Sequence, residues 1–194
     1  MKNIILLFAL LISFNLQAQS HYNQGTPPLG ITFEGYTQIG AIVTKTHVGD
    51  AVGPRLTLGG MIYSTDPNEA DWVMAGDLFY HNMYARNMNG NTENDFIGAT
   101  AGIGLKRSKS MFFTVNGLYV QQMIPKARVN ENAHNASFGM SAKALIKILP
   151  IGERLYLGFS GEIGRFFTDI SFDDNATDGS TFVSGSLSFF WTLY

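Results

Sequence analysis

The chain of 194 residues contains no cysteine. This absence excludes a lipoprotein acylation site, structural disulfides and thiolate chemistry together. Charged residues are also scarce, at 14% of the chain, and the formal net charge of −2 is too small to indicate a basic surface for nucleic acid. We therefore expect no nucleic-acid partner, and the sequence contains no motif that calls for a metal or a cofactor.

Long hydrophobic runs are missing as well. The longest one, Ile4–Ile12, has nine residues, whereas a helix needs about 20 to span a bilayer. Lys2 precedes this run and Ala18 offers a small residue for cleavage, so residues 1–18 are predicted to be an export signal. A short periplasmic extension is then expected over residues 19–30. If the rest of the chain enters a membrane, it does so as strands.

What the chain does have is alternation. Between residues 31 and 194, apolar and polar residues alternate with the period of two that separates the two faces of a β-strand. Most of the alternating segments are at least as long as the roughly 9 to 11 residues that a tilted strand needs to cross hydrocarbon. The eight predicted strands are 31–44, 54–63, 72–82, 95–106, 110–123, 135–148, 154–168 and 181–194.

The gaps between these strands alternate in length. Four longer polar gaps are residues 45–53, 83–94, 124–134 and 169–180. The three gaps that fall between them are shorter: residues 64–71, 107–109 and 149–153. This rhythm predicts long extracellular loops and tight periplasmic turns, with both termini in the periplasm.

The last segment, 181–194, alternates almost to its end. Val183, Leu187, Phe189 and Trp191 share one face, and serines occupy the other. Such a terminal strand suits a closed barrel, in which the last strand pairs with the first and leaves no edge in lipid. The rival fold is a soluble lipid-binding barrel, which would carry its charges outside and its apolar residues inside.

The whole pattern resembles the small eight-stranded outer-membrane barrels of the OmpX and OmpA membrane-domain type, and the broader porin-like group. Those families commonly end in an aromatic residue that is recognised during assembly, and Tyr194 matches it, although the apolar run before it is one residue out of phase. The resemblance implies an all-β, eight-stranded, antiparallel, up-and-down transmembrane β-barrel. It also implies a bacterial outer-membrane location, with outer-membrane lipids as neighbours.

Eight strands enclose an interior just wide enough for side chains to fill, so a general diffusion channel is not expected. Charges shut away from water must be paired, and the face predicted to point inward contains three acids and three bases. We expect a satisfied polar network, with a gated ion or proton path as the alternative. The candidate residues are Glu34, Arg55, Asp77, Lys143, Lys147 and Glu162. The fifth strand is the least regular, because Leu118 and Val120 share its polar face.

Aromatic residues gather at the strand ends, which predicts the two interfacial girdles of a membrane barrel. The periplasmic girdle would contain Tyr63, Trp72, Phe112, Tyr156, Trp191 and Tyr194. The outer girdle would contain Tyr84, Phe96, Tyr119, Phe138, Phe167 and Phe182.

Some small barrels modify lipids with a histidine, a serine and an acid near the outer rim. The candidates for such chemistry are His47, His81, His134, Ser137, Asp77 and Asp95, but no hydrolase elbow is present. The oxygen-rich segments 87–95 and 169–178 lack the spacing of an EF-hand loop, so we expect solvated turns there rather than calcium sites.

We therefore expect a non-enzymatic outer-membrane barrel with a structural or recognition role through extracellular loops, whose ligand the sequence does not identify. A second hypothesis is an accessory subunit that contacts another outer-membrane protein through small residues. The candidates for that contact are Gly98, Ala99, Ala101, Gly102 and Gly104. A narrow channel and a lipid-modifying barrel enzyme are the third and fourth hypotheses.

Overall fold

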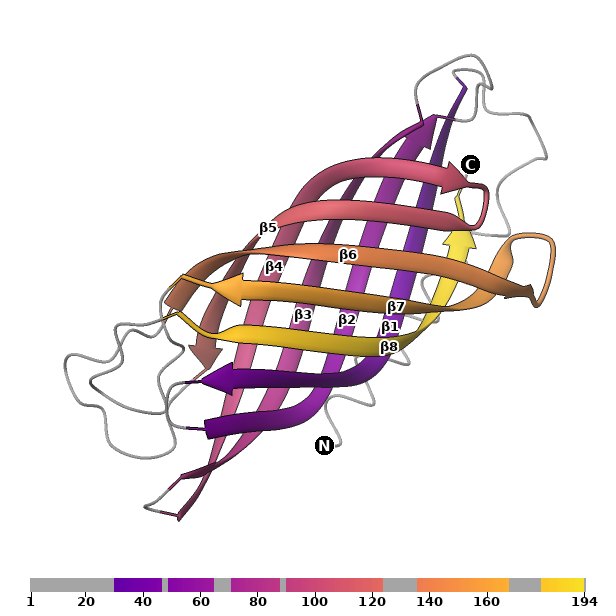
Figure 1. The fold of residues 1–194 in the computed structure, drawn as a ribbon. Coiled ribbons are helices and arrows are strands. Elements are labelled where there is room, and N and C mark those ends of the chain that lie inside the picture. Colours follow the sequence, from indigo (N-terminus) through magenta and orange to yellow (C-terminus); the bar gives the residue numbers. More distant parts are fainter. Residues whose placement is uncertain are drawn as a thin grey trace.

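The computed structural model describes residues 30–46, 49–64, 71–87, 90–123, 136–167 and 179–193. The described chain consists of eight long strands joined by short links or by segments outside these ranges (Figure 1). The strands are β1 (Ile31–Thr46), β2 (Gly49–Ser64), β3 (Trp72–Asn87), β4 (Gly90–Ser108), β5 (Met111–Met123), β6 (Ala136–Pro150), β7 (Leu155–Phe166) and β8 (Thr181–Thr192). The predicted signal 1–18 and most of the extension 19–30 lie outside the described residues.

Each strand pairs antiparallel with the next, and β8 pairs with β1, so the sheet closes into a barrel. The closing ladder runs from Glu34 opposite Thr192 to Lys45 opposite Thr181. Closure satisfies the backbone groups that an edge strand would leave unpaired. The predicted eight-stranded up-and-down topology is confirmed. Among the described residues, no helix is long and apolar enough to cross a membrane.

The prediction of long loops at residues 45–53 and 83–94 is wrong. The ladders continue to Thr46 opposite Gly49 and to Asn87 opposite Gly90, so only residues 47–48 and 88–89 separate these strands. The polar composition of these segments was misleading because ladder hydrogen bonds join backbone groups and do not require apolar side chains. We call this end of the barrel the hairpin end, and the opposite one, where β1 begins and β8 ends, the terminal end.

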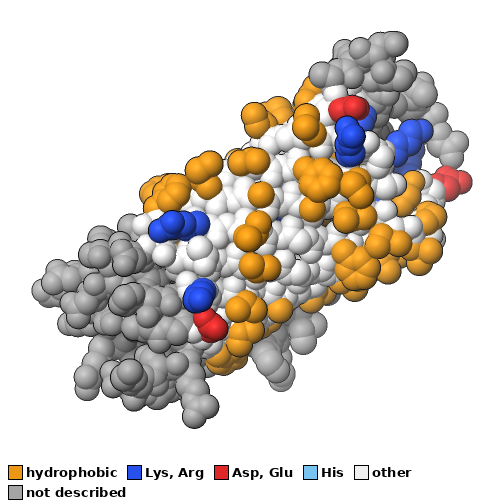
Figure 2. Space-filling view, viewed as in Figure 1, with side chains coloured by type: hydrophobic (Ala, Val, Ile, Leu, Met, Phe, Trp, Pro, Cys, Tyr) orange, Lys and Arg blue, Asp and Glu red, His pale blue; other side chains and the backbone are white. Residues whose placement is uncertain are grey.

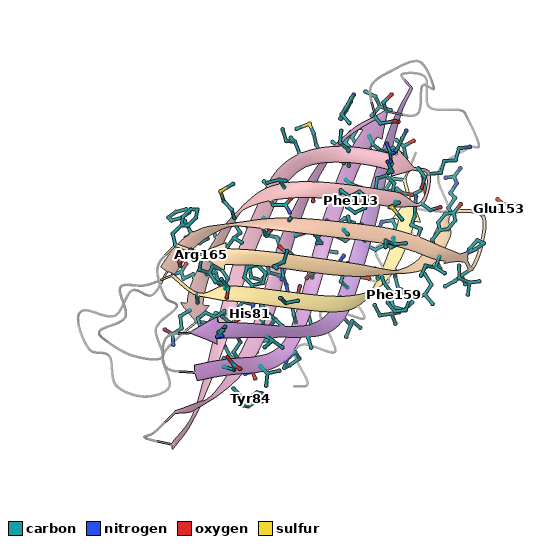
Figure 3. The ribbon with its side chains drawn as sticks, in the orientation of Figure 1. His81, Tyr84, Phe113, Glu153, Phe159 and Arg165 are labelled. Carbon is teal, nitrogen blue, oxygen red and sulfur yellow. The ribbon has the colours of Figure 1, made fainter. Side chains whose placement is uncertain are left out.

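Apolar side chains cover the outside of the barrel. Leu78, Ile103 and Ile163 are 62%, 67% and 61% exposed, and Phe113 and Phe159 also lie on this surface (Figure 3). On the face drawn in Figure 2, hydrophobic side chains cover the middle while charged ones gather toward the two ends. Arg165 and Glu153 mark opposite ends (Figure 3). This surface is the inverse of a soluble barrel's, and it suits contact with lipid.

Two apolar clusters lie inside the barrel, one toward each end. The cluster toward the hairpin end contains Ile42, Ala51, Phe79, Met83, Phe96, Leu118, Val120, Phe166 and Phe182. The cluster toward the terminal end contains Tyr36, Met61, Tyr63, Val73, Phe112, Leu145 and Phe190. Leu118 and Val120 thus share the inner face of β5 with Thr114 and Asn116, as the alternation predicted.

The expected girdles are therefore partly wrong. Tyr63, Phe96, Phe112 and Phe182 are buried inside, because the period of two places them on the inward face whatever their distance from the strand end. On the outer surface, Tyr84, Phe138 and Phe167 are 50%, 65% and 56% exposed. Tyr194 lies outside the described residues.

The glycines of β4 do not form the small outer face that the accessory-subunit hypothesis predicted. An added Cβ at Gly98 would lie 2.2 Å from the Phe79 ring, and one at Gly102 would lie 2.2 Å from the Asn116 side chain. Gly98, Gly102 and Gly104 therefore sit on the crowded inner face of β4 and cannot form a small outer face for another barrel. Ala99 and Ala101 are on the outer side of the same strand.

Candidate functional site in the barrel interior

Six charged residues point into the barrel and form three ion pairs across it. We call them the lumen network: Glu34, Arg55, Asp77, Lys143, Lys147 and Glu162. Each pair joins strands that are not neighbours in the sheet, namely β6 with β1, β6 with β3, and β2 with β7. The side chains therefore reach through the lumen to one another. Their role as a binding site stays a prediction.

The middle of the network is built around Asp77. Its Oδ2 atom accepts hydrogen bonds from Lys143 Nζ at 2.7 Å and from Thr100 Oγ1 at 2.8 Å. Its Oδ1 atom accepts one from the Tyr36 hydroxyl. The Lys143 ammonium also lies 5.0 Å from the centre of the Tyr36 ring. A carboxylate with three donors from three other strands is well compensated for its burial.

The pair nearest the terminal end is Glu34 and Lys147. Lys147 Nζ lies 2.8 Å and 3.0 Å from the two carboxylate oxygens, and Thr192 Oγ1 donates to one of them at 2.9 Å. The same ammonium is 5.0 to 5.7 Å from the ring centres of Phe112, Tyr156 and Tyr63. Aromatic faces attract a cation electrostatically, so they replace part of the solvation that Lys147 loses.

The pair nearest the hairpin end is less completely satisfied. Arg55 Nη1 lies 2.8 Å from Glu162 Oε2 and 3.3 Å from the Ser184 hydroxyl oxygen. The guanidinium carbon sits 4.4 Å from the centre of the Phe79 ring. Arg55 Nε and Glu162 Oε1 have no hydrogen-bond partner among the described residues. This part of the lumen therefore has spare hydrogen-bonding capacity.

His81 lies beside the Arg55 pair, and its surroundings bear on the hypothesis of an enzyme. Its ring packs between Phe79 and Phe96, with centroid distances of 5.4 Å and 5.0 Å. Neither ring nitrogen has a hydrogen-bond partner in the described part of the chain. His81 is thus not hydrogen-bonded to a serine or a carboxylate there, as the base of a catalytic triad would be.

The remaining candidates for lipid chemistry are dispersed or outside the described residues. Asp95 accepts hydrogen bonds from Tyr80 and Asn82, and the Ser137 hydroxyl donates to the carbonyl of Phe138. His47, His134 and the whole oxygen-rich segment 169–178 fall outside the described ranges. The solvated turn expected over 87–95 is wrong for most of that segment, because its backbone belongs to β3 and β4 on either side of residues 88–89. Within those ranges, no cluster of three or more His, Asp or Glu residues could hold a metal ion.

The alternation in sequence placed the six charged members of the network on the inward face but did not show which side chains support each of them. Tyr36, Thr100 and Thr192 share the inward faces of their strands, so the same pattern contained a signal for them. Which residue meets which depends on how the barrel closes, and the face of a residue does not supply that information.

Comparisons with known proteins find no family model and no curated protein that match the sequence. Solved structures do match. The crystal structure of Neisserial surface protein A (NspA) aligns over 84% of this chain and 98% of its own, with 12% identity and a TM-score of 0.53. A structure from the de novo design of transmembrane β-barrels covers 88% and 99%, with 15% identity and a TM-score of 0.36. The NanC porin covers 83% and 98%, with 6% identity and a TM-score of 0.33.

The likeness to NspA bears on the fold, and it agrees with the geometry. A closed ladder, an apolar outer surface and a charged interior occur together in this chain. The predicted resemblance to small membrane barrels is confirmed at the level of architecture: the chain is an eight-stranded, antiparallel, up-and-down β-barrel of the transmembrane kind.

Proposed function

We propose that this chain is a bacterial outer-membrane β-barrel with a plugged lumen, without enzymatic activity, and with a structural or recognition role through its extracellular segments. The observation that carries the proposal is the set of three ion pairs that cross the lumen inside an apolar cylinder. Charged side chains locked together at three levels leave little room for a solute, and eight strands enclose little space to begin with.

The apolar surface supports the location. Exposed apolar patches larger than a few hundred Å² are rare on soluble monomers, and here large apolar side chains are exposed on all eight strands. The predicted export signal at 1–18 supports the same compartment. Because the strand number is even, β1 begins and β8 ends at the same end of the barrel, which we assign to the periplasm. The hairpin end would then face the outside and present the connections that meet partners.

Fractionation tests the location. The protein should sediment with the outer membrane, require detergent for extraction, and migrate differently on a gel before and after boiling, because folded barrels resist unfolding in detergent. Recovery in the soluble periplasmic fraction without detergent would contradict the proposal.

Conductance in planar bilayers tests the plug. The purified protein should show no steady open level, whereas a reproducible single-channel step would favour a narrow channel.

Two further measurements test an enzymatic role and a role as a subunit. A change in lipid A mass on overproduction would favour a lipid-modifying enzyme, and stoichiometric co-purification of a second barrel in mild detergent would favour an accessory subunit.

A further inference from the structure

A cavity of about 270 Å³ opens at the terminal end of the barrel, and the Glu34–Lys147 pair forms part of its wall. Its lining comes from six strands and the turn between β4 and β5, and we call it the terminal cup. The residues that line it are Glu34, Tyr63, Lys106, Lys109, Lys147, Tyr156 and Thr192. Figure 1 shows that the β4–β5 and β6–β7 turns lie at this end, close to the end of β8.

The charges of the cup do not cancel. Among the described residues that line it, three are lysines and one is an acid. Glu34 is already engaged, because Lys147 contacts both of its carboxylate oxygens and Thr192 donates to one of them. Lys147 and Glu34 therefore neutralise each other, and the positive charges of Lys106 and Lys109 remain.

Among the described residues, these two lysines have a weak anionic partner or none. Lys106 Nζ donates to the backbone carbonyl of Ser64, and its nearest acid among the described residues, Asp71, lies 3.9 Å away with a side chain that is 67% exposed. Exposed ion pairs of this kind contribute little, because water screens the attraction between the two charges. Lys109 is exposed and has no ion-pair partner in the described ranges. The cup thus presents two ammonium groups with donor capacity to spare.

Two tyrosines shape the space between the lysines. The Lys106 ammonium lies 5.4 Å from the centre of the Tyr63 ring, and Lys147 approaches the same ring at 5.7 Å. Tyr156, on β7, packs against the apolar cluster that contains Tyr63. The Tyr63 ring attracts the Lys106 ammonium and reduces the water around it, which strengthens a charge-assisted hydrogen bond formed by that group.

We propose that the terminal cup is a binding site for a small anion with phosphate or carboxylate chemistry, held by Lys106 and Lys109. Ligand pockets for drug-sized molecules are about 300 to 1,000 Å³, so a cavity of about 270 Å³ suits a single anionic group rather than a large ligand. Ammonium groups bind phosphate as point charges with rotatable donors, which matches two lysines on a rim.

The test is a titration of the purified protein with inorganic phosphate at constant ionic strength. A maltoside detergent is used because it carries no phosphate, and nuclear magnetic resonance follows the backbone amides of β1, β4 and β8 at the terminal end. Saturable shifts are expected there in the wild-type protein. The double variant Lys106→Gln, Lys109→Gln should weaken binding by at least about tenfold, because it removes both charged donors. Neither lysine lies in the middle of the barrel, so the variant should still fold.

Lys45→Gln is the matched control, because Lys45 is an exposed lysine at the opposite end of the barrel. It should leave the phosphate affinity unchanged. The absence of saturable shifts in the wild-type protein would overturn the proposal, and so would equal affinity in the double variant.

A second pair of titrations separates two sources of the anion. In nanodiscs of phosphatidylglycerol, a lipid headgroup that occupies the cup would lower the apparent phosphate affinity relative to nanodiscs of phosphatidylcholine. Equal affinity in the two lipids would identify a free solute. Either result supports the cup as an anion site, whereas loss of phosphate binding in both lipids would contradict it.

Discussion

At the scale of single residues, the buried charges of the lumen are stable only as pairs. Lys143 and Asp77 lie in the interior with side-chain exposures of 2%, and each compensates for the loss of water around the other. Removing one partner leaves an uncompensated charge, which typically costs about 3–5 kcal/mol. Replacing both with neutral groups of similar shape costs far less, because no charge then remains buried.

We therefore expect Lys143→Met to lower the free energy of unfolding by about 3–5 kcal/mol, measured by urea unfolding in lipid vesicles. The double variant Lys143→Met, Asp77→Asn should recover most of that loss. The asparagine Oδ1 can accept from one of the two hydroxyls, Tyr36 or Thr100, and its amide nitrogen can donate to the oxygen of the other. If the double variant is no more stable than Lys143→Met, the ion pair is not the reason for the loss.

Two aromatic residues of the lumen provide a second, matched prediction. Tyr36→Phe removes a hydroxyl that donates to the Asp77 carboxylate, so the free energy of unfolding should fall by about 1.5–3 kcal/mol. His81→Phe removes two buried ring nitrogens that lack partners among the described residues, and it keeps the packing against Phe79 and Phe96. Stability should then be unchanged or higher by about 1 kcal/mol. A large loss in His81→Phe would show that the imidazole has a polar partner.

The residues of this site were predictable to different degrees. The inward face of Glu34, Asp77 and Lys143 follows from the period of two, because one residue in each alternating pair must point into the barrel. Their partners do not follow from it. Arg55 meets Glu162 because closure and stagger of the barrel bring β2 and β7 into reach across the lumen, and those are properties of the whole sheet.

At the scale of elements, strand existence was more predictable than strand ends. Apolar alternation located all eight strands, yet β1 to β4 extend beyond it at the hairpin end. Polar stretches such as 83–94 continue the ladder through backbone hydrogen bonds, which composition does not reveal. At the terminal end, β2 and β3 are separated by seven residues, so the long and short connections do not alternate as regularly as expected.

The two faces of the sheet should differ in how well they tolerate a side chain larger than glycine. At Gly161 an added Cβ meets no atom within 4 Å, whereas at Gly102 it would lie 2.2 Å from the Asn116 side chain and from the Val115 carbonyl oxygen. Gly161→Ala should raise the free energy of unfolding by about 0.4–1 kcal/mol, because it restricts the unfolded chain without a clash. Gly102→Ala should lower it by about 1–3 kcal/mol through overpacking. Urea unfolding of both variants measures the contrast, and effects of the same sign would contradict the assigned faces.

At the scale of the whole molecule, two simple rules combine to place charged residues inside the barrel and apolar residues on its outer surface, the reverse of a soluble barrel. A period of two sorts side chains onto two faces, and closure assigns one face to the lumen and the other to the surroundings. Glu34 and Asp77 are consequently buried although they are charged, and Phe33 and Leu187 remain 42% and 37% exposed although they are apolar. Only a surrounding medium that is itself apolar makes such a molecule stable.

If the medium is a bilayer, the destabilisation caused by a charged side chain on the outer surface should depend on its depth in that bilayer. Leu78 lies in the middle of the outer surface, beside Ala99 on β4, whereas Leu149 lies near the terminal end of β6; they are 62% and 55% exposed. In a bilayer, Leu78→Arg should lower the free energy of unfolding by about 2–4 kcal/mol, and Leu149→Arg by no more than about 1 kcal/mol, because the end of the strand reaches the interface. Arg165 already shows that a cation is accommodated near the other end. Unfolding in lipid vesicles measures both variants, and equal costs would mean that the apolar belt does not sit in hydrocarbon.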